Sequence, residues 1–390
     1  MRILVIGGGK QGRAAVYDLI HSDAVTSVTC ADKDVHSLQS FLSTLGANNA
    51  QAVSVDASDG RQLRQLFGQG FDVVIDLLPI QFIRPVCEAA IDTKTNLVNT
   101  YYDHGLRPMA DGIRQVGIAV LPEMGLDPGI DLVFCAEAVR RFDEVTLLQC
   151  YGAGFPEPSA ADNPLKYKIT WIWPGVLDSY DRPARLLRSG REVNISGSEM
   201  FAPENIHLTQ VPGIGTLEAF PNGDAVRYAR ELGIDATVQD CGRYAMRWPG
   251  HAAIWDTFKK LGFLDQAPVQ GLPGQVTPRQ FMAHHLEPRL QYKPNERDVA
   301  VILVVCEGQK QGRRQRLVLS LVDYRDLSTG LLAMNRTVGF TASIAAQMLA
   351  SKGIQARGLL SPLRDVPYEE FVAQLCQRGM SVQESLTPLG

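Results

Sequence analysis

The sequence predicts an α/β fold in which a doubly wound parallel sheet is followed by an α+β domain with a mixed sheet. Three observations support this prediction. Apolar runs alternate with helical stretches over residues 1–130, and a glycine-rich turn follows the first run. From about residue 132, long loops rich in Pro and Gly separate strands of alternating polarity.

The first part of the chain contains six predicted strands, at residues 2–6, 27–31, 52–55, 73–78, 96–99 and 118–121. Apolar residues three or four positions apart predict a helix in each gap, as Leu38, Phe41, Leu42 and Leu45 do after the second strand. Parallel strands require such crossover helices. The order therefore predicts an open sheet with helices on both faces.

The pattern changes in the second part of the chain. Loops are predicted at residues 152–164, 211–223 and 271–277, and alternating strands at 299–305 and 317–321, which is typical of a mixed or antiparallel sheet. A later apolar helix, around Ile344 and Met348, is best buried by returning to the first domain. We therefore expect one domain over residues 1–131, completed by about 335–390, and a substrate-binding and dimerisation domain over 132–334.

Composition indicates an ordinary globular enzyme. The chain has 390 residues, of which 45% are hydrophobic and 21% charged, and a net charge of −4, which gives no electrostatic footprint for nucleic acid or membrane surfaces. The seven cysteines are scattered without metal-ligand spacing, so we predict reduced thiols and no metal site. No signal-peptide pattern or apolar run of membrane-spanning length is visible, and we expect a cytoplasmic protein.

A glycine-rich turn follows the first strand. Gly7, Gly9 and Gly12 form a G-x-G-x-x-G pattern that encloses Lys10 and Gln11. The first glycine allows a sharp exit from the strand, the second lets backbone approach a pyrophosphate, and the third lets the helix lie close on the sheet. The helix N-terminus offers free N–H groups to an anion. We predict a dinucleotide-binding domain of the Rossmann type; a plain strand-to-helix turn is the alternative.

Asp32 lies at the end of the second strand, about 20 residues after Gly12, where the fingerprint places a ribose-binding acid. Its carboxylate can accept hydrogen bonds from both ribose hydroxyls but would repel a 2′-phosphate. We therefore expect NAD to be preferred over NADP. A solvated acid in a turn is the alternative reading of Asp32.

Further cofactor contacts are predicted where other strands end, because ligands bind at the carboxyl ends of the strands in such a sheet. The residues at these positions are Asp56, Ala57, Leu78, Pro79 and Asn99.

Asp127 is the predicted catalytic residue. It lies in residues 122–131, after the sixth strand, and would face the nicotinamide end of the crevice. A nicotinamide site needs a group that takes the substrate proton, and we expect Asp127 to do so with hydrogen bonds from Tyr101 or Tyr102. An Asp-Pro-Gly turn with no catalytic part is the alternative.

Two segments of the second domain combine cationic, polar and aromatic residues that suit an amino-acid substrate. Residues 162–171 include Asn163, Lys168 and Trp171; an ordinary capped helix start is the alternative there. In residues 242–251, Arg243 or Arg247 is suited to clamp a carboxylate. His251 is suited to bind the substrate or carry a proton. Of the two arginines we select Arg243, and each of these residues also has an ordinary structural reading.

These segments resemble the saccharopine dehydrogenase, or saccharopine reductase, family, which includes lysine 6-dehydrogenases. The resemblance covers the opening Val-Ile-Gly-Gly-Gly and residues 99–102, 124–131, 162–171, 247–251, 295–298 and 337–346. It implies a Rossmann domain completed by C-terminal residues and an inserted substrate domain that supports a homodimer. It also implies NAD(P)-dependent oxidation of a C–N bond at the ε-carbon of lysine.

The chain is shorter within the substrate domain than the fungal saccharopine reductases, and it departs from them at three further places. It has Gly223 where they have an Arg for a substrate carboxylate, residues 151–153 in place of Cys-Gly-Gly, and Leu132 in place of a His. These changes concern recognition of the glutamate half of saccharopine. We predict oxidation of saccharopine to glutamate and aminoadipate semialdehyde. Oxidative deamination of free lysine, and a dinucleotide-binding protein without catalysis, are the alternatives.

Overall fold

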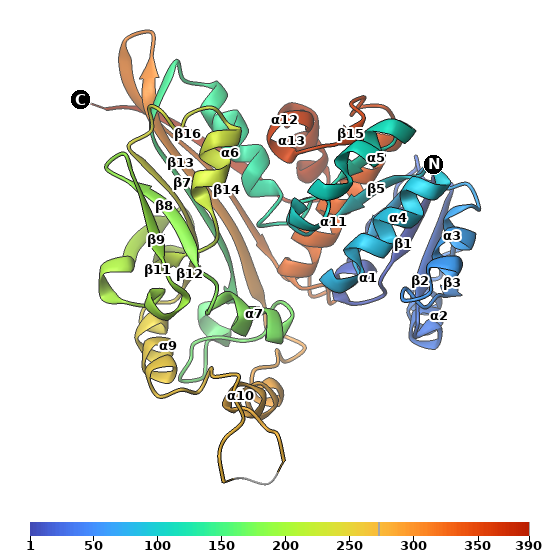
Figure 1. Cartoon of the computed structure of the whole chain (residues 1–390), viewed down its shortest axis with the longest axis horizontal. Helices are drawn as coiled ribbons and strands as arrows, with labels where there is room; N and C mark the ends of the chain where they lie inside the picture. Colours follow the sequence, from blue (N-terminus) through green and yellow to red (C-terminus); the bar gives the residue numbers. More distant parts are fainter. Residues whose placement is uncertain (272–273, 390) are drawn as a thin grey trace. The chain divides into compact units, whose positions relative to one another are not determined.

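The computed structural model describes residues 1–271 and 274–389, which form two compact units (Figure 1). The first unit consists of Met1–Val133 and Asn335–Met380, and the second of Phe134–Met334 and the residues from Ser381 on. The predicted loop at 271–277 includes residues 272 and 273, which lie outside the described residues.

The first unit contains a sheet of seven parallel strands in the order β15-β6-β5-β4-β1-β2-β3. Its strands are β1 (Arg2–Ile6), β2 (Ser27–Asp32), β3 (Ala50–Ser54), β4 (Val73–Asp76), β5 (Asn96–Asn99), β6 (Ala119–Leu121) and β15 (Gly358–Leu359). The doubly wound fold is confirmed, with all six predicted strands present. The seventh, β15, has only two residues, too few to show a period in the sequence.

The strand order reverses between β1 and β4. The chain runs from β1 to β2 and β3 on one side, and from β4 to β5 and β6 on the other. In open α/β sheets this reversal opens a crevice at the carboxyl ends of the strands, where ligands bind. The fold therefore directs attention to the residues that follow β1, β2, β4 and β5.

Helices cover both faces of this sheet (Figure 1). They are α1 (Lys10–Ile20), α2 (Val35–Leu45), α3 (Gly60–Phe67), α4 (Ile83–Thr93), α5 (Ala110–Val116), α12 (Pro362–Asp365), α13 (Tyr368–Gln377) and most of α11 (Ala333–Ala350). Asp34 and Asp59 begin α2 and α3 by accepting backbone N–H groups with their side chains. Leu63, Val86 and Leu97 belong to the core on the face that α3 and α4 cover.

The C-terminal part of the first unit is anchored to α1. Gly339 of α11 lies so close that a Cβ there would be 2.6 Å from the carbonyl oxygen of Gln11. The buried Asp18 carboxylate pairs with Arg378 at 2.6 Å and accepts the hydroxyl of Ser343 at 2.6 Å. These contacts attach residues 335–380 to α1, the helix that follows the glycine turn.

The second unit contains a mixed sheet in the order β10-β11-β12-β7-β13-β14-β16, with β8 and β9 beside β12. Its strands are β7 (Glu144–Pro156), β8 (Ala184–Arg188), β9 (Arg191–Ile195), β10 (His207–Val211), β11 (Gly215–Pro221), β12 (Asp240–Arg247), β13 (Asp298–Lys310), β14 (Arg313–Tyr324) and β16 (Val382–Pro388). Only β12 and β7 pair in parallel; the other pairings are antiparallel. The expected mixed sheet is confirmed.

Three boundaries differ from the sequence prediction. Residues 152–156 were expected in a loop but belong to β7, because this stretch pairs with β13 on one side and, at its beginning, with β12 on the other. The expected loop at 211–223 contains β11, which pairs with β10 and β12. The residues after 380 were expected in the first domain. Residues 382–388 form β16 instead, which pairs with β14 at the end of the second sheet.

The second unit contains an aromatic core. The helices of this unit are α7 (Trp173–Ser179), α8 (Ala225–Glu231), α9 (His251–Lys260), α10 (Pro278–Leu286) and most of α6 (Ile130–Arg140). Tyr167, Trp173, Tyr180, Phe220 and Trp255 are at most 2% exposed and share one cluster. In the described part of the chain, none of the helices combines the length and apolar character that crossing a lipid bilayer requires.

Candidate functional site

The glycine turn has the geometry of a dinucleotide site. Gly7 has φ +100°, and a Cβ there would lie 2.7 Å from the Leu77 carbonyl carbon. A Cβ on Gly12 would lie 1.8 Å from the Gly7 oxygen, so only glycine lets α1 approach the strand exit this closely. A Cβ on Gly9 would meet nothing within 4 Å. The space next to Gly9 is where the fold predicts that a pyrophosphate approaches.

The first turn of α1 suits an anion. Gly9 begins the helix without a side-chain cap, and no acidic residue lies in the first turn. Lys10 is exposed there and Gln11 is half-buried. Uncapped N–H groups and the positive end of the helix dipole favour a phosphate at this position. The residues of the turn therefore fit a dinucleotide.

Asp32 shapes this turn from the end of β2. Its carboxylate accepts the backbone N–H of Gly8 at 2.6 Å and that of Asp34 at 2.9 Å. Asp56, after β3, accepts the N–H and hydroxyl of Ser58, which lower its pKa, and pairs with Lys33 at 3.5 Å. The neighbouring Ala57 is buried.

The ends of β4 and β5 lie side by side, because Asp76 and Asn99 are register partners. The Asp76 side chain accepts the N–H of Leu78 at 3.1 Å and fixes the turn before the exposed Pro79. Burial raises the pKa of Asp76 to about 7. Asn99 is fully buried and accepts the N–H of Tyr101. Asp76 was not among the predicted site residues, although a charged residue at the end of the apolar strand Val-Val-Ile-Asp was a signal for it.

Tyr101 and Asp127 both belong to the first unit. Burial, and then the charge of Asp76, raise the pKa of Tyr101 to about 12, so Tyr101 keeps its proton and can donate a hydrogen bond. Asp127 is half-buried and precedes Pro128, whose carbonyl accepts the N–H of Gly125. Tyr102 is half-buried, and its ring stacks with that of His104 at 6.0 Å.

Several of the predicted substrate residues have partners within the second unit. The Asn163 side chain bonds the backbone of Leu165 and Tyr167, which is a turn-forming role. Lys168 is buried and pairs with Glu296 at 2.7 Å and Asp162 at 2.9 Å. The Lys168 ammonium is thus already neutralised by carboxylates of the same unit.

Two further predicted residues pack against neighbours. Trp171 is half-buried, and its ring lies over Gly175. The Arg243 guanidinium lies 4.8 Å from the centre of the Tyr228 ring in the sheet interior. Neither of these contacts identifies a substrate site.

Arg247 has a different environment. It is 9% exposed, and its Nη1 donates a hydrogen bond to the carbonyl of Met246 at 2.7 Å. It lies 5.1 Å from the centre of the Tyr167 ring and 6.0 Å from that of Phe220. Its Nε–H has no partner, and the described residues provide it with no ion pair.

The nearest acid by register does not neutralise this charge. Glu218 is opposite Arg247 in the β11–β12 pairing, but its carboxylate accepts the N–H groups of Gly250 and Ala252 at 3.1 and 2.6 Å. A buried cation without a counter-ion is costly, so the site favours an anion. The choice of Arg243 or Arg247 as a carboxylate ligand stays a prediction.

His251 is held beside this arginine. Its Nε2 lies 2.8 Å from the hydroxyl of Tyr180. Burial, and then the charge of Arg247, lower the pKa of His251 well below its usual value, so it is neutral. We refer to Arg247, Tyr167, Tyr180, Phe220 and His251 as the arginine cluster.

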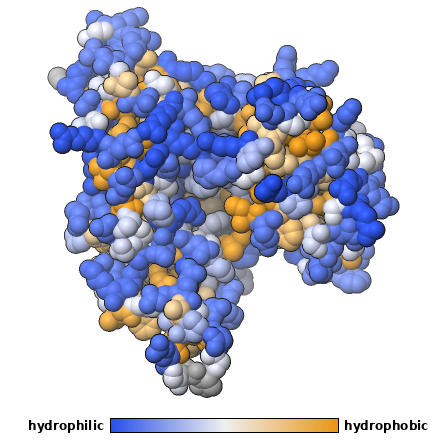
Figure 2. Space-filling view, viewed as in Figure 1, coloured by the Kyte–Doolittle hydropathy of each residue, from blue (hydrophilic) through white to orange (hydrophobic). Residues whose placement is uncertain are grey.

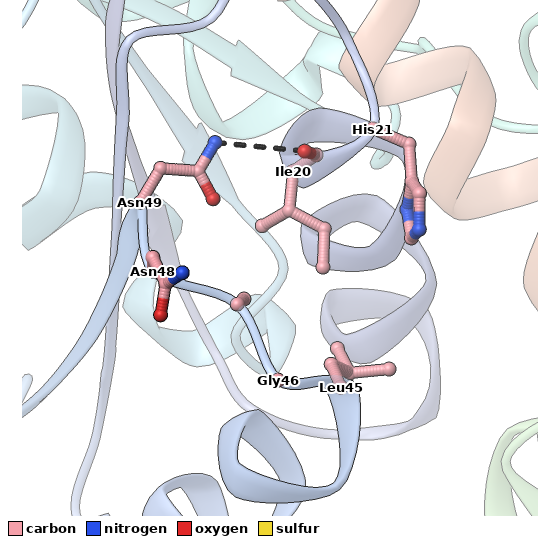
Figure 3. A pocket seen from close by; sticks show the side chains of 7 residues that line it. Ile20, His21, Leu45, Gly46, Asn48 and Asn49 are labelled. Carbon is pink, nitrogen blue, oxygen red and sulfur yellow. Dashed lines mark hydrogen bonds between the residues drawn. The ribbon is translucent and has the colours of Figure 1, made fainter.

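Each unit has a surface hollow that is lined by other residues. One, of about 310 Å³, is formed by the C-terminal ends of α1 and α2 and the loop before β3 (Figure 3). Its His21 bonds the carbonyl of Tyr17, and Asn49 bonds that of Ile20. The other, of about 550 Å³, is lined by residues of α10, Val276 and Arg289. Figure 2 shows one face of the molecule, on which hydrophobic side chains lie in scattered groups among hydrophilic ones. Neither hollow contains a group that the predicted chemistry needs.

Comparisons with known proteins agree with this fold. The family model described as the saccharopine dehydrogenase NADP binding domain matches residues 3–121, and the saccharopine dehydrogenase C-terminal domain matches residues 125–380. Saccharopine dehydrogenase (NADP(+), L-glutamate-forming) of Saccharomyces cerevisiae is 26% identical over 92% of this chain and 93% of its own length. The bovine alpha-aminoadipic semialdehyde synthase is 25% identical over 97% of this chain. The chain spans about half the length of that synthase, 47%.

Solved structures show the same fold. The apo saccharopine dehydrogenase (L-Glu forming) of Saccharomyces cerevisiae superposes with a TM-score of 0.86 at 23% identity, over 99% of both chains. A homospermidine synthase of Legionella pneumophila in complex with NAD gives a TM-score of 0.63 at 11% identity, over 99% of this chain and 91% of that one.

The expected preference for NAD is wrong. The matching domain is an NADP binding domain, and the fungal relatives are named as NADP(+) enzymes. The prediction depended on Asp32 being a ribose ligand, whereas its carboxylate holds the backbone of Gly8 and Asp34. Its position at the end of β2 therefore did not identify the cofactor.

The two family models together cover almost the whole chain, and the larger matches more than half of it. The glycine turn, the doubly wound sheet of the first unit and these matches show that the chain belongs to the saccharopine dehydrogenase family of oxidoreductases.

Proposed function

We propose that this chain oxidises the secondary amine of saccharopine, with NADP as the electron acceptor, to give glutamate and aminoadipate semialdehyde. The names of the fungal relatives, which match over nearly their whole length, support the reaction and the cofactor. The observation that carries the proposal is the buried Arg247 guanidinium without an ion pair among the described residues, because it calls for an anionic group on the substrate.

The proposed roles follow from the chemistry of each group. Loss of a hydride from carbon and a proton from nitrogen converts the C–N bond to an imine, which water hydrolyses. NADP, when bound at the glycine turn, supplies the acceptor for the hydride. Asp127 takes the proton, and the protonated Tyr101 donates a hydrogen bond to the substrate. Arg247 holds a carboxylate bidentately.

An assay of NADPH formation from saccharopine tests the proposal. We expect absorbance at the reduced nicotinamide band to rise with saccharopine and NADP, and Arg247→Met to raise KM. Binding of NADP without reduction by saccharopine or lysine would favour a dinucleotide-binding protein without catalysis.

Oxidation of free lysine is a second candidate, because of Gly223. This residue has φ +71° in the turn between β11 and α8, and its carbonyl accepts the N–H of Arg185. It offers no side chain where the fungal enzymes are expected to have an arginine. One carboxylate, as in lysine, matches the single guanidinium of the arginine cluster. A homodimer and a cytoplasmic location stay predictions from the sequence.

The reverse reaction separates the two substrates. Starting from aminoadipate semialdehyde and NADPH, saccharopine formation requires glutamate, whereas lysine formation requires ammonia. Saturation with glutamate supports the first proposal. Saturation with ammonia and indifference to glutamate would reverse the order of the two candidates.

A further inference from the structure

One buried carboxyl group of the first unit lies next to the glycine turn. Asp76 is the last residue of β4, and its register partners are Asn99 on β5 and Ile6 on β1, the residue before Gly7. Its side chain is buried, with 1% of the residue exposed. The strand order reverses between β1 and β4, so Asp76 lies where the sheet opens its ligand crevice.

The turn that Asp76 holds packs against the glycine turn. The Asp76 carboxylate accepts the N–H of Leu78 at 3.1 Å, and the N–H of Leu77 donates to the Ile6 carbonyl at 2.8 Å. A Cβ on Gly7 would lie 2.7 Å from both the carbonyl carbon and the carbonyl oxygen of Leu77. Because the two turns are in contact, a charge on Asp76 acts on a dinucleotide that is bound at the glycine turn.

No cation of the described residues pairs with Asp76. Asn99 beside it has a neutral amide, whose Nδ2 has no hydrogen-bond partner. Burial, and then the charge of Asp76, raise the pKa of Tyr101, which follows β5, to about 12. Burial, and then the charges of Glu88 and Asp76, raise the pKa of Cys87 of α4 to about 12. These two groups are therefore neutral, and burial without a counter-ion favours the neutral acid at Asp76.

We propose that Asp76 controls the affinity of the cofactor site through its own proton: the neutral acid admits the phosphates of the dinucleotide, and the carboxylate repels them. A dinucleotide brings negative charge to the glycine turn, and a buried carboxylate has the same sign. Binding of the cofactor therefore takes up a proton at Asp76. This inference goes beyond the proposed function, because it concerns the cofactor alone and holds whichever amine is oxidised.

The direction of the pH dependence follows from linkage. Burial raises the pKa of Asp76 to about 7 in the free enzyme, and bound phosphates raise it further because they disfavour another negative charge. Affinity is therefore full at about pH 6, where Asp76 is neutral with and without cofactor, and it falls as pH rises through 7. Repulsion by one unit charge at an intermediate dielectric constant changes a dissociation constant by about tenfold.

The first test compares the NADPH dissociation constants of the wild type and Asp76→Asn from pH 6 to pH 9, measured by fluorescence titration. Asn keeps an oxygen that can accept the N–H of Leu78 and has no charge. We expect equal constants at pH 6 and a constant about tenfold higher in the wild type at pH 9. The 2′-phosphate of the cofactor titrates in both enzymes, so it cancels in the ratio of the constants. A ratio that does not change with pH overturns the proposal.

The chain offers a matched control in Asp59. Its carboxylate accepts the N–H of Arg61 two positions later, as that of Asp76 does with Leu78, but its side chain is 32% exposed. The N–H of Arg61 lowers the pKa of Asp59, so Asp59 stays ionised from pH 6 to pH 9. We expect Asp59→Asn to keep the pH dependence of the wild type. Loss of that dependence in Asp59→Asn overturns the assignment to the buried carboxyl.

A second neutral variant guards against a folding defect in the first. In Asp76→Ser the hydroxyl oxygen can accept the N–H of Leu78, as serine does in turns of this kind. We expect Asp76→Ser to bind NADPH with the pH dependence of Asp76→Asn. The pH dependence of the wild type in either neutral variant would overturn the proposal.

Proton uptake provides a readout without turnover. Calorimetry of NADPH binding at pH 7.5 in Hepes and in Tris, whose ionisation enthalpies differ, counts the protons that are taken up. We expect the wild type to take up about half a proton more per site than Asp76→Asn. Equal counts overturn the proposal. If the enzyme oxidises neither saccharopine nor lysine while the counts differ, the proposed function is wrong and the role of Asp76 stands.

Discussion

The glycine turn of the first unit and the arginine cluster of the second are built in different ways. The turn depends on backbone, since its key positions are Gly7, Gly9 and Gly12 and its donors are the N–H groups that begin α1. The cluster depends on side chains from α9, β11, β12 and the segments around α7. The turn is local in sequence, whereas the cluster forms only when residues about 85 positions apart fold together.

This difference sets how each region responds to substitution. A turn made of backbone is sensitive to added atoms, because there is no side chain to adjust. A cluster made of side chains changes in what it can bind when one of them is replaced. The predictions below follow from this comparison and run from the largest expected effect to the smallest.

Asp127→Asn tests the proposed proton transfer, which involves neither the glycine turn nor the arginine cluster. The amide keeps the shape of the carboxylate but cannot take a proton, so kcat should fall by roughly 10² to 10⁴. NADPH binding, followed by fluorescence titration, should stay within about twofold of the wild type. Turnover within a few-fold of the wild type would make Asp127 a turn residue only.

Arg247→Met tests the cluster by removing its charge. We expect KM for the substrate to rise by about a hundredfold, the upper range for hydrogen bonds to a charged group. The free energy of unfolding should not fall, since an unneutralised buried cation is removed and an apolar chain of similar length replaces it. Arg243→Met is the comparison, with KM unchanged. The interpretation fails if the two variants give the same KM.

Gly12→Ala and Gly9→Ala test the turn by adding one methyl group at each position. At Gly12 the Cβ would overlap the Gly7 oxygen, so we expect the free energy of unfolding to fall by about 1 to 3 kcal/mol. At Gly9 the space is open, so stability should hold while NADPH binding weakens. Urea unfolding and NADPH titration measure the two effects. Full NADPH affinity in Gly9→Ala would show that the cofactor does not approach this residue.

Asp76→Asn has the smallest expected effect, and it depends on pH. Burial places the pKa of Asp76 at about 7 in the folded protein, against about 3.9 when unfolded. Between these values the folded state holds a proton that the unfolded state releases, so the contribution of Asp76 to stability falls as pH rises toward 7 and is constant above. Relative to the wild type, the variant should gain up to about 2 kcal/mol between pH 5.5 and pH 8. A difference that does not change with pH would contradict this.

The sequence predicted the parts of the molecule that depend on local spacing. The strand ends that carry Asp32, Asp56, Asn99 and Tyr101 follow from the period of the apolar residues, and the structure has all six predicted strands. The cofactor type could not be predicted in this way. The spacing from Gly12 predicts that an acidic residue lies at the end of β2, but it does not show that this residue accepts hydrogen bonds from Gly8 and Asp34.

The second unit was harder to predict for a physical reason. Lys168 and Arg247 are both cations in polar, aromatic segments, and nothing local shows that Glu296 and Asp162 neutralise the first while the second has no ion pair among the described residues. Glu296 is 128 positions from Lys168. Residues 152–156 of β7 were predicted as a loop because their pairing with β13 is also distant in sequence.

The pairing of β16 with β14 has a consequence for synthesis on the ribosome. β14 ends at Tyr324 and its outer neighbour begins only at Val382. Translation adds about 5 to 20 residues per second, so roughly 3 to 13 seconds pass between the synthesis of the last residue of β14 and that of the last residue of β16. During that time the nascent chain exposes an unpaired strand edge that other chains can join.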